Sequence, residues 1–416
     1  MAEQRQKTQT QSPAAQQPDR HTSRMPSDEH ICIVTPYPLT RVSGISQIVR
    51  ELDRALAQSG VEVVGWCPAS STKPSGCRVK GVPLRSRNLR DLELAIRTAS
   101  RILSARRAIG LVHAQQFHLQ SAAALFTSRL VGRGGVLTIH VRTNASSLWR
   151  GRVQRVVDWV CLHSADVVTT VSAPVANSLR GHPVDIIPNG VDIDVFRPSS
   201  RNRTRIRTSL GLESDKVVVF AGRWSRTKGL DKLLAAFDSV ASMHSTIHLL
   251  VIGEPAPDEP PIYPEAFVRA SALGRVHVLG RLKDSAEVSA HLSAADLFAL
   301  PSIAEGMPLA LLEAMATGLP IVASDIGVHR ALLNTYGCGW LVPPGDVDGL
   351  VRVLSRFARE GAPKEWPSVA RSAAVEHHSA AAMARAYQAV YAAVLSKRRQ
   401  HAGFKRLPLA RESRPY

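Results

Sequence analysis

The sequence predicts an α/β protein built from two doubly wound, Rossmann-like domains that face a cleft. Short runs of β-branched and aliphatic residues alternate with segments of helical apolar spacing, which is typical of parallel sheets covered by helices on both faces. The alternation pauses in a polar, arginine-rich stretch at residues 194–207 and then restarts. With 416 residues, the chain is long enough for two domains with separate hydrophobic cores.

The N-terminal half supplies the first set of strands. Residues 31–34 form a β-branched run, and a helix follows in which apolar residues recur at helical spacing from Ile45 to Leu56. Gly60 ends this helix. Further strand candidates lie at residues 61–66, 111–113, 136–139, 167–171 and 185–187. A helical pattern at residues 92–107 separates two of them, as a parallel sheet requires.

The second set of strands begins after the pause. Its candidates lie at residues 217–220, 247–252, 276–279, 297–300, 321–323 and 340–342. A helix is expected from about Leu230. The resulting organisation is a disordered tail at residues 1–29, Rossmann-like domains at 30–195 and 196–379, an alanine-rich helix at 380–396 and a basic tail at 397–416.

The composition is that of a soluble globular protein, with 44% hydrophobic and 21% charged residues. The five cysteines form no CxxC pair, which argues against a disulfide framework or a structural zinc site and favours a reducing compartment. No apolar run reaches the roughly 18 residues of a membrane span. Residues 1–29 lack the apolar core of a secretory signal, so we expect a cytoplasmic protein.

The net charge of +18 is unevenly distributed. Residues 30–195 carry 20 basic and 10 acidic side chains, and the last 24 residues carry 7 and 1. Residues 196–392 carry 21 and 19. This pattern indicates an anionic partner for the N-terminal half and the tail, either a membrane face or a phosphate-bearing substrate; a solvated basic surface is the simpler alternative. Nucleic acid is disfavoured, because zinc-finger spacing and RNP-like aromatic strands are missing.

A first candidate motif follows the strand at 297–300. Glu305 is expected in the loop at the strand end, and Glu313 lies further along the next helix. Pro308 suits the first turn of that helix, where its missing N–H costs nothing. Carboxylates beside a helix N-terminus can bind sugar or ribose hydroxyls, although a solvated glutamate pair would look the same.

A second candidate motif follows the strand at 217–220. Residues 222–229 contain Arg223, Lys228 and two glycines. Glycine lets the backbone approach a ligand, and arginine and lysine suit a diphosphate. Taken alone, a solvated basic turn would be the better interpretation of this stretch.

In this order and spacing, the motifs resemble glycosyltransferase family 4, a large group of retaining enzymes with the GT-B fold. The resemblance runs through most of residues 31–395. The matching segments are residues 43–44, 138–140, 165–172, 187–192, 222–229, 251–253, 279–281 and 305–313. It implies that the N-terminal domain takes the acceptor, that the C-terminal domain takes a nucleotide-sugar donor, and that the helix at 380–396 crosses back to the N-terminal domain.

The resemblance also implies roles for the donor-binding residues. Arg223 and Lys228 would bind the diphosphate and stabilise charge on the leaving group, which is a catalytic role. Glu313 would hold the ribose hydroxyls. Gly44 would let the N-terminal loop approach the phosphates, and the backbone near Leu282 would touch the nucleobase.

The remaining roles concern the transferred sugar. Glu305, a further catalytic residue, would hold that sugar together with backbone N–H groups near Gly306, Met307 and Leu309. His140, also catalytic, would face the reacting sugar from the N-terminal domain.

The sequence departs from the family pattern at three positions, and the missing glutamate near Ala331 bears on sugar selectivity rather than on the reaction class. Val141 follows His140 where an acidic or small residue is common, Pro308 has no N–H to donate, and Ala331 stands where a glutamate is frequent. Two Asp-x-Asp segments, at residues 192–194 and 346–348, match the metal motif of a different glycosyltransferase fold. Both lie outside that context, so no metal is expected.

The sequence therefore predicts a cytoplasmic, metal-independent, retaining glycosyltransferase of the hexosyltransferase type. It would use a nucleotide-diphosphate sugar and no other cofactor. Its acceptor would be a glycan or lipid-linked molecule of envelope or exopolysaccharide synthesis, met at the inner face of the plasma membrane. Glycosylation of a soluble small molecule and a non-catalytic GT-B-like binding protein are the alternatives.

Overall fold

The computed structural model describes residues 29–39, 44–69, 77–85, 89–141, 148–179, 181–255, 272 and 274–404. The expected disordered tail, apart from Glu29, lies outside the described residues, and so does the basic tail beyond Phe404. Ser43, which precedes Gly44 in the expected glycine loop, lies outside them as well.

The N-terminal domain is built on a seven-stranded parallel sheet with the order β3-β2-β1-β4-β5-β6-β7. Its strands are β1 (His30–Val34), β2 (Val63–Pro68), β3 (Val79–Val82), β4 (Ile109–Gln115), β5 (Gly134–Ile139), β6 (Val167–Thr170) and β7 (Asp185–Ile186). Its helices are α1 (Gly44–Gln58), α2 (Arg90–Ser104), α3 (Leu119–Leu130), α4 (Leu148–Ser164) and α5 (Ala173–Asn177).

The C-terminal domain is built on a six-stranded parallel sheet with the order β10-β9-β8-β11-β12-β13. Its strands are β8 (Lys216–Ala221), β9 (Ile247–Ile252), β10 (Val276–Gly280), β11 (Leu297–Leu300), β12 (Ile321–Ser324) and β13 (Gly339–Val342). Its helical elements are α6 (Ser200–Leu210), the 3₁₀ turn η1 (Arg226–Lys228), α7 (Leu230–Met243), α9 (Ser285–Ala294), α10 (Leu309–Ala316), α11 (Gly327–Tyr336), α12 (Val347–Glu360) and α13 (Trp366–His377).

The prediction of two doubly wound α/β domains is confirmed. The strands read as continuous apolar runs because helices bury them from both sides; residues 217–220 of β8, for example, are fully buried. In β5, a Cβ on Gly134 would meet Val394, whereas one on Gly135 would meet Leu125 of α3. Adjacent strand residues point to opposite faces, so α3 and the C-terminal helix cover opposite sides of this sheet.

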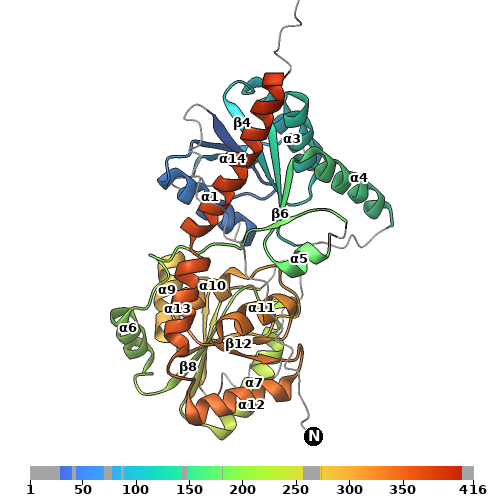
Figure 1. The fold of residues 1–416 in the computed structure, drawn as a ribbon. Coiled ribbons are helices and arrows are strands. Elements are labelled where there is room, and N and C mark those ends of the chain that lie inside the picture. Colours follow the sequence, from blue (N-terminus) through green and yellow to red (C-terminus); the bar gives the residue numbers. More distant parts are fainter. Residues whose placement is uncertain are drawn as a thin grey trace, which may run out of the picture.

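The C-terminal helix α14 (Ala380–Phe404) leaves the second domain and packs on the first, against α1, β4 and β5 (Figure 1). The chain passes between the two domains twice, near Val191 and near Ala380, and these two connections lie side by side. Val191 N donates to His378 O at 2.8 Å, and Ala380 N donates to Val191 O at 2.8 Å. Gly190 is needed here, because a Cβ would lie 2.7 Å from the Cα of Ala380.

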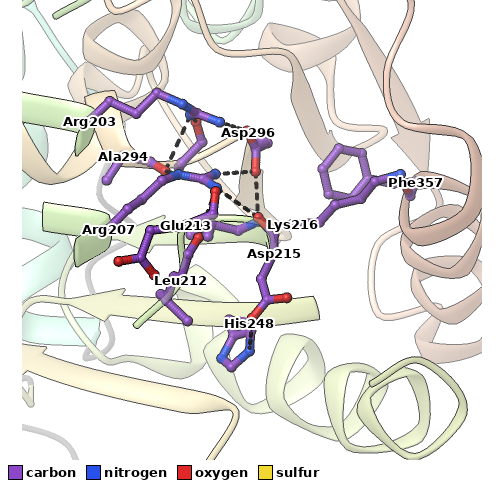
Figure 2. A network of polar contacts seen from close by, with 12 residues as sticks. Arg203, Arg207, Leu212, Glu213, Asp215, Lys216, His248, Ala294, Asp296 and Phe357 are labelled. Atoms are coloured by element: carbon purple, nitrogen blue, oxygen red, sulfur yellow. Dashed lines mark hydrogen bonds and ion pairs between the residues drawn. The ribbon is translucent and has the colours of Figure 1, made fainter. Parts of the chain in front are cut away.

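The arginine-rich stretch at residues 194–207 was expected to interrupt the pattern, and this expectation is wrong for its second half. Helix α6 begins there, with Ser199 capping its N-terminus and Gly211 ending it at a φ of 67°. Its attachment is polar (Figure 2): Arg203 and Arg207 each approach a carboxylate oxygen of Asp296 at 2.5 Å. A helix held by ion pairs has no apolar stripe to reveal it in the sequence.

Strand β3 was missed for a related reason. Val79 and Val82 are buried, but Lys80 and Gly81 between them are exposed, so the strand shows no apolar run. It lies at the edge of the sheet beside β2. Such short edge strands carry little sequence signal.

Candidate active site

The two domains touch where the carboxyl ends of their sheets meet. His140 follows β5, and Gly306 lies in the loop after β11. A Cβ on Gly306 would lie 2.0 Å from the carbonyl oxygen of His140, so only glycine fits. Ser172, which follows β6, donates its hydroxyl to the carbonyl of Gly306 at 2.7 Å. This contact places candidate residues of both domains side by side, at the sheet edge where open α/β folds bind ligands.

Lys228 and Glu305 lie together in the C-terminal domain. Lys228 ends the turn η1 after β8, and its Nζ lies 2.6 Å from Glu305 Oε1. The side chains are 20% and 10% exposed. Gly229 has a φ of 69°, and a Cβ there would lie 2.1 Å from the carbonyl oxygen of Pro301, so only glycine lets the turn pack this closely against the β11 loop. The close contact of the two loops holds the ion pair in place.

Glu313 lies deeper, on α10, and is 7% exposed. Gln47 of α1 donates its amide to Glu313 Oε1 at 2.6 Å, a hydrogen bond between the two domains. Burial raises the pKa of Glu313 to about 7, and the hydrogen bond from Gln47 opposes this rise. Gln47 therefore makes a hydrogen bond to the carboxylate that the family resemblance assigns to the ribose hydroxyls.

His140 is 6% exposed and is held by two consecutive glutamines. Its Nε2 lies 2.7 Å from Gln115 Oε1, and its backbone N–H donates to Gln116 Oε1 at 3.0 Å. Gln116 has a φ of 69°, the only positive φ at a non-glycine residue in the described part of the chain. Burial lowers the pKa of His140 to about 4, so the ring is neutral at pH 7.

The other predicted residues lie outside these contacts. Met307 accepts a hydrogen bond on its carbonyl from Asn189 Nδ2 at 2.9 Å, and Leu309 begins α10. Pro308 was expected in the first turn of α10 because of its missing N–H, but it is the N-cap residue of that helix. Arg223 and Gly44 are exposed, the latter at the first residue of α1.

Leu282 follows β10 and packs against the core. Within the described ranges, none of Arg223, Gly44 and Leu282 forms a hydrogen bond or ion pair with Lys228 or Glu305. The structure thus brings four of the predicted residues into direct proximity, in two contacts. These are Lys228 with Glu305, and His140 with Gly306, the residue that follows Glu305.

Sequence reasoning missed several residues of this region. Gln115 is the last residue of β4 and Gln116 follows it, and the rule that ligands lie at carboxyl strand ends could have found them. His329 on α11 is fully buried, with Nδ1 2.9 Å from Ser324 O. Burial lowers its pKa, and the charges of Glu305 and Lys228 act on it in opposite directions. Gln47 carried no usable signal, and Ser172 ends the matching segment at residues 165–172 but was given no role.

The Asp-x-Asp segments have local partners. Asp192 Oδ1 accepts from the backbone N–H groups of Asp194 and Val195 at 3.1 Å each. Asp346 Oδ1 accepts from Gly349 N at 2.8 Å and caps α12. Nowhere in the described part of the chain do three or more His, Cys, Asp or Glu side chains gather as metal ligands could. Among the same residues, no helix has both the length and the apolar character of a membrane span.

Two facing α/β domains with a basic turn and two glutamates at their junction define a protein of the GT-B class. Solved structures support the fold. Sucrose-phosphate synthase from Thermosynechococcus elongatus matches with a TM-score of 0.75 at 21% identity, over 89% of this chain and 100% of that one. HepE from Anabaena, solved with UDP and glucose, matches with a TM-score of 0.67 at 18% identity, over 88% and 99%.

Family models match both halves of the chain. The model described as Glycosyltransferase Family 4 matches residues 42–195, and the model described as Glycosyl transferases group 1 matches residues 215–360. The chain belongs to glycosyltransferase family 4, which confirms the resemblance seen in the sequence. Phosphatidyl-myo-inositol mannosyltransferase of Mycobacterium leprae is 31% identical over 210 residues, 50% of this chain and 53% of that protein. The match spans about half the length of this relative.

Proposed function

We propose that the protein transfers a sugar from a nucleotide-diphosphate sugar to an acceptor, with retention of the anomeric configuration and without a metal ion. The observation that carries this proposal is the Lys228–Glu305 ion pair. Glu305 lies in the loop after β11, and the next residue of that loop, Gly306, contacts His140. A cation and a carboxylate then lie beside the loop that meets the backbone of His140 across the domain junction. These are the groups that breaking a sugar–phosphate bond requires.

The donor would lie on the C-terminal domain. Lys228 and the exposed Arg223 would neutralise the diphosphate, and the N-terminus of α10 would add partial positive charge. Glu313 would accept hydrogen bonds from the ribose after Gln47 has left it. The UDP complex of HepE, a protein of the same fold, supports a nucleotide donor.

The chemistry follows from where charge develops. As the bond between the sugar and the diphosphate breaks, negative charge builds on the phosphate oxygen, and Lys228 and Arg223 stabilise it there. Glu305 would accept hydrogen bonds from sugar hydroxyls with the oxygen that does not bind Lys228. His140 would accept a further one as a neutral imidazole. Fixed cations supply the charge that a metal ion would otherwise bring, so the reaction would be independent of metal.

The acceptor would be lipid-linked and would be met at the cytoplasmic face of the plasma membrane. Among the described residues, nine large hydrophobic side chains on or beside three neighbouring helices are exposed to solvent. They are Leu89, Leu92, Ile96, Leu103, Phe126, Leu130, Val153, Val156 and Trp159. We call this set the α2–α4 surface.

Charge supports an anionic bilayer as the partner of the α2–α4 surface. Residues 89–107, 119–133 and 151–164 carry nine arginines against three acidic residues. Apolar side chains that enter the interface and arginines that meet anionic headgroups give reversible docking, with each arginine near the surface contributing about 1 kcal/mol. The relative from Mycobacterium leprae is named for a phosphatidyl-inositol substrate, which supports a lipid acceptor.

The transferase activity is tested by incubating the full chain with a panel of nucleotide sugars and measuring nucleoside-diphosphate release. At least one sugar should give release that Lys228→Ala lowers strongly and Lys232→Ala leaves unchanged. No release from any sugar, with or without phospholipid vesicles, would contradict the proposal.

Membrane docking is tested by sedimentation with vesicles. Anionic vesicles should bind the protein more tightly than neutral vesicles, and Ile96→Glu or Val156→Glu should weaken binding. Met243→Glu is the matched control, since Met243 is 58% exposed on the other domain, against 59% for Ile96 and 62% for Val156. Equal binding to both vesicle types at low salt would rule out this docking mode.

A further inference from the structure

Helix α14 buries two tyrosine side chains against the N-terminal sheet. Tyr387 and Tyr391 are four residues apart, so they lie on the same face of the helix. They are 2% and 0% exposed, although α14 runs along the outside of the domain (Figure 1). Their rings lie beside His113 of β4, with centroids at 4.8 and 5.6 Å. Buried tyrosine hydroxyls require hydrogen-bond partners, and these two find them in the sheet.

The hydroxyl of Tyr391 lies 2.7 Å from His113 Nδ1. The other ring nitrogen of His113, Nε2, lies 2.6 Å from Thr138 Oγ1 and 3.0 Å from Gln115 Nε2. Thr138 in turn lies 3.0 Å from the hydroxyl of Tyr387. A buried network of hydrogen bonds therefore runs from α14 into the carboxyl ends of β4 and β5.

Gln115 connects this network to His140, and its amide sets the direction of each hydrogen bond. The amide oxygen can only accept, so His140 Nε2 carries a proton and donates it to Gln115 Oε1 at 2.7 Å. The amide nitrogen can only donate, so His113 Nε2 is unprotonated. The proton of neutral His113 is then on Nδ1, which donates to Tyr391.

Neutral rings are what the surroundings favour. Burial lowers the pKa of His113 to about 3 and that of His140 to about 4. At pH 7 neither ring is protonated on both nitrogens. His140 Nδ1 is thus left with a lone pair, and it is buried without a hydrogen-bond partner among the described residues.

We propose that Gln115, His113 and Tyr391 are positioning residues that orient His140 and hold it as the Nε2–H tautomer. The unprotonated Nδ1 is then available to accept a hydrogen bond from a hydroxyl of the reacting sugar. Because α14 reaches this network directly after the crossing from the C-terminal domain, the docking of α14 on the first sheet sets the state of His140. The catalytic consequence, but not the tautomer itself, rests on the proposed transferase function.

The tautomer is measured by ¹⁵N NMR of the histidine-labelled full chain at pH 7. The His140 signals are assigned by their absence in His140→Gln. In the wild type, His140 should show a protonated Nε2 and His113 a protonated Nδ1. Gln115→Leu should convert His140 to a mixture of tautomers, and Tyr391→Phe should reduce the Nδ1–H form of His113.

Turnover supplies the second measurement. Gln115→Leu should lower kcat about 10²-fold with little change in KM for the donor, because only the geometry of His140 is lost. Tyr391→Phe should lower kcat about fivefold, the equivalent of one neutral hydrogen bond. Tyr336→Phe is the matched control: it removes another tyrosine–histidine contact, at 3.1 Å from His378, outside this network. Its kcat should stay at the wild-type value.

A wild-type His140 protonated on Nδ1 would overturn the inference. So would an unchanged His140 spectrum in Gln115→Leu, or an unchanged kcat in Tyr391→Phe. If Gln115→Leu does not fold, Tyr391→Phe, which removes one oxygen atom, still decides the question. If the wild type releases no nucleoside diphosphate from any sugar, the proposed function fails, and the NMR measurement still decides the tautomer.

Discussion

Lys228 and Glu305 form an ion pair of 2.6 Å between the loops that follow β8 and β11, two adjacent strands of the C-terminal sheet. The pair is largely shielded from water, with side-chain exposures of 20% and 10%. Glu305 therefore holds the lysine before any donor is bound. In the proposed reaction, an incoming diphosphate would meet a cation that is already oriented, and the carboxylate would keep one oxygen for the sugar.

Removing either cation of the β8 loop should impair catalysis. We expect Lys228→Ala and Arg223→Ala each to lower turnover about 10²–10³-fold, because each removes a positioned charge from the leaving group. The fold should persist, since both residues lie in the connection between β8 and α7 and not in a strand or an α-helix. Lys232→Ala, in which an exposed lysine of α7 is lost, serves as the control. If either variant keeps near-wild-type turnover and unchanged donor affinity, the proposed binding of the donor diphosphate by that residue is wrong.

A chelator should leave the activity essentially intact. In the proposed reaction, Arg223, Lys228 and the N-terminus of α10 would meet the phosphate charge, so no divalent cation would be needed. The measurement is product release with EDTA, and again after adding Mg²⁺ or Mn²⁺. If activity disappears with EDTA and returns with metal, one of the Asp-x-Asp segments has been misassigned.

Glu313→Gln should change the pH dependence of stability. The folded protein keeps the Glu313 proton up to a pKa of about 7, whereas the unfolded chain loses it near the ordinary value of 4.5. Wild-type stability therefore falls as the pH rises from 4.5 through 7.

At pH 8 the glutamine variant should be more stable by on the order of 3 kcal/mol, and at pH 4 the difference should vanish. Denaturant unfolding at the two pH values measures this difference, with the exposed Glu360→Gln as control. The same variant should bind the donor about tenfold more weakly, because its neutral amide accepts more weakly from the ribose hydroxyls. If the difference in stability between the variant and the wild type is the same at both pH values, the pKa of Glu313 is not raised in the folded protein.

Gly306→Ala should separate the two domains locally. Its new Cβ would lie 2.0 Å from His140 O, so the backbone must move apart at this contact. In a closely packed junction such a movement lowers stability. We expect turnover to fall at least about tenfold, since His140 and Glu305 would lose their relative positions. Gly151→Ala in α4, where a Cβ meets nothing within 4 Å, is the control. Equal turnover of both variants would contradict the close approach.

Asp296→Ala should destabilise the C-terminal domain. Arg207 is 6% exposed and would lose its carboxylate partner, at a cost of about 3 kcal/mol. Asp325→Ala removes the partner of Arg330, which is 54% exposed, and should change stability little. Chemical unfolding of both variants checks this, and a stable Asp296→Ala would mean that the network of Figure 2 does not hold α6 in place.

The sequence by itself determined the buried strands of the two sheets and the placement of the motifs. Buried parallel strands are continuous apolar runs, such as residues 297–300 of β11, and this signal is local. Because Arg223 and Glu305 follow such runs, their place at the carboxyl ends of strands could be predicted. The family resemblance rests on the same short segments.

Only the tertiary structure decided which side chains meet. Gln47 and Glu313 are 266 residues apart, and His113 and Tyr391 are 278 apart. Helix α6 was missed because ion pairs with Asp296, on another element, hold it in place. Periodicity reports how a segment buries its own surface, whereas these contacts depend on how two domains and a returning helix pack together. That packing is set by the whole chain at once, and no local pattern encodes it.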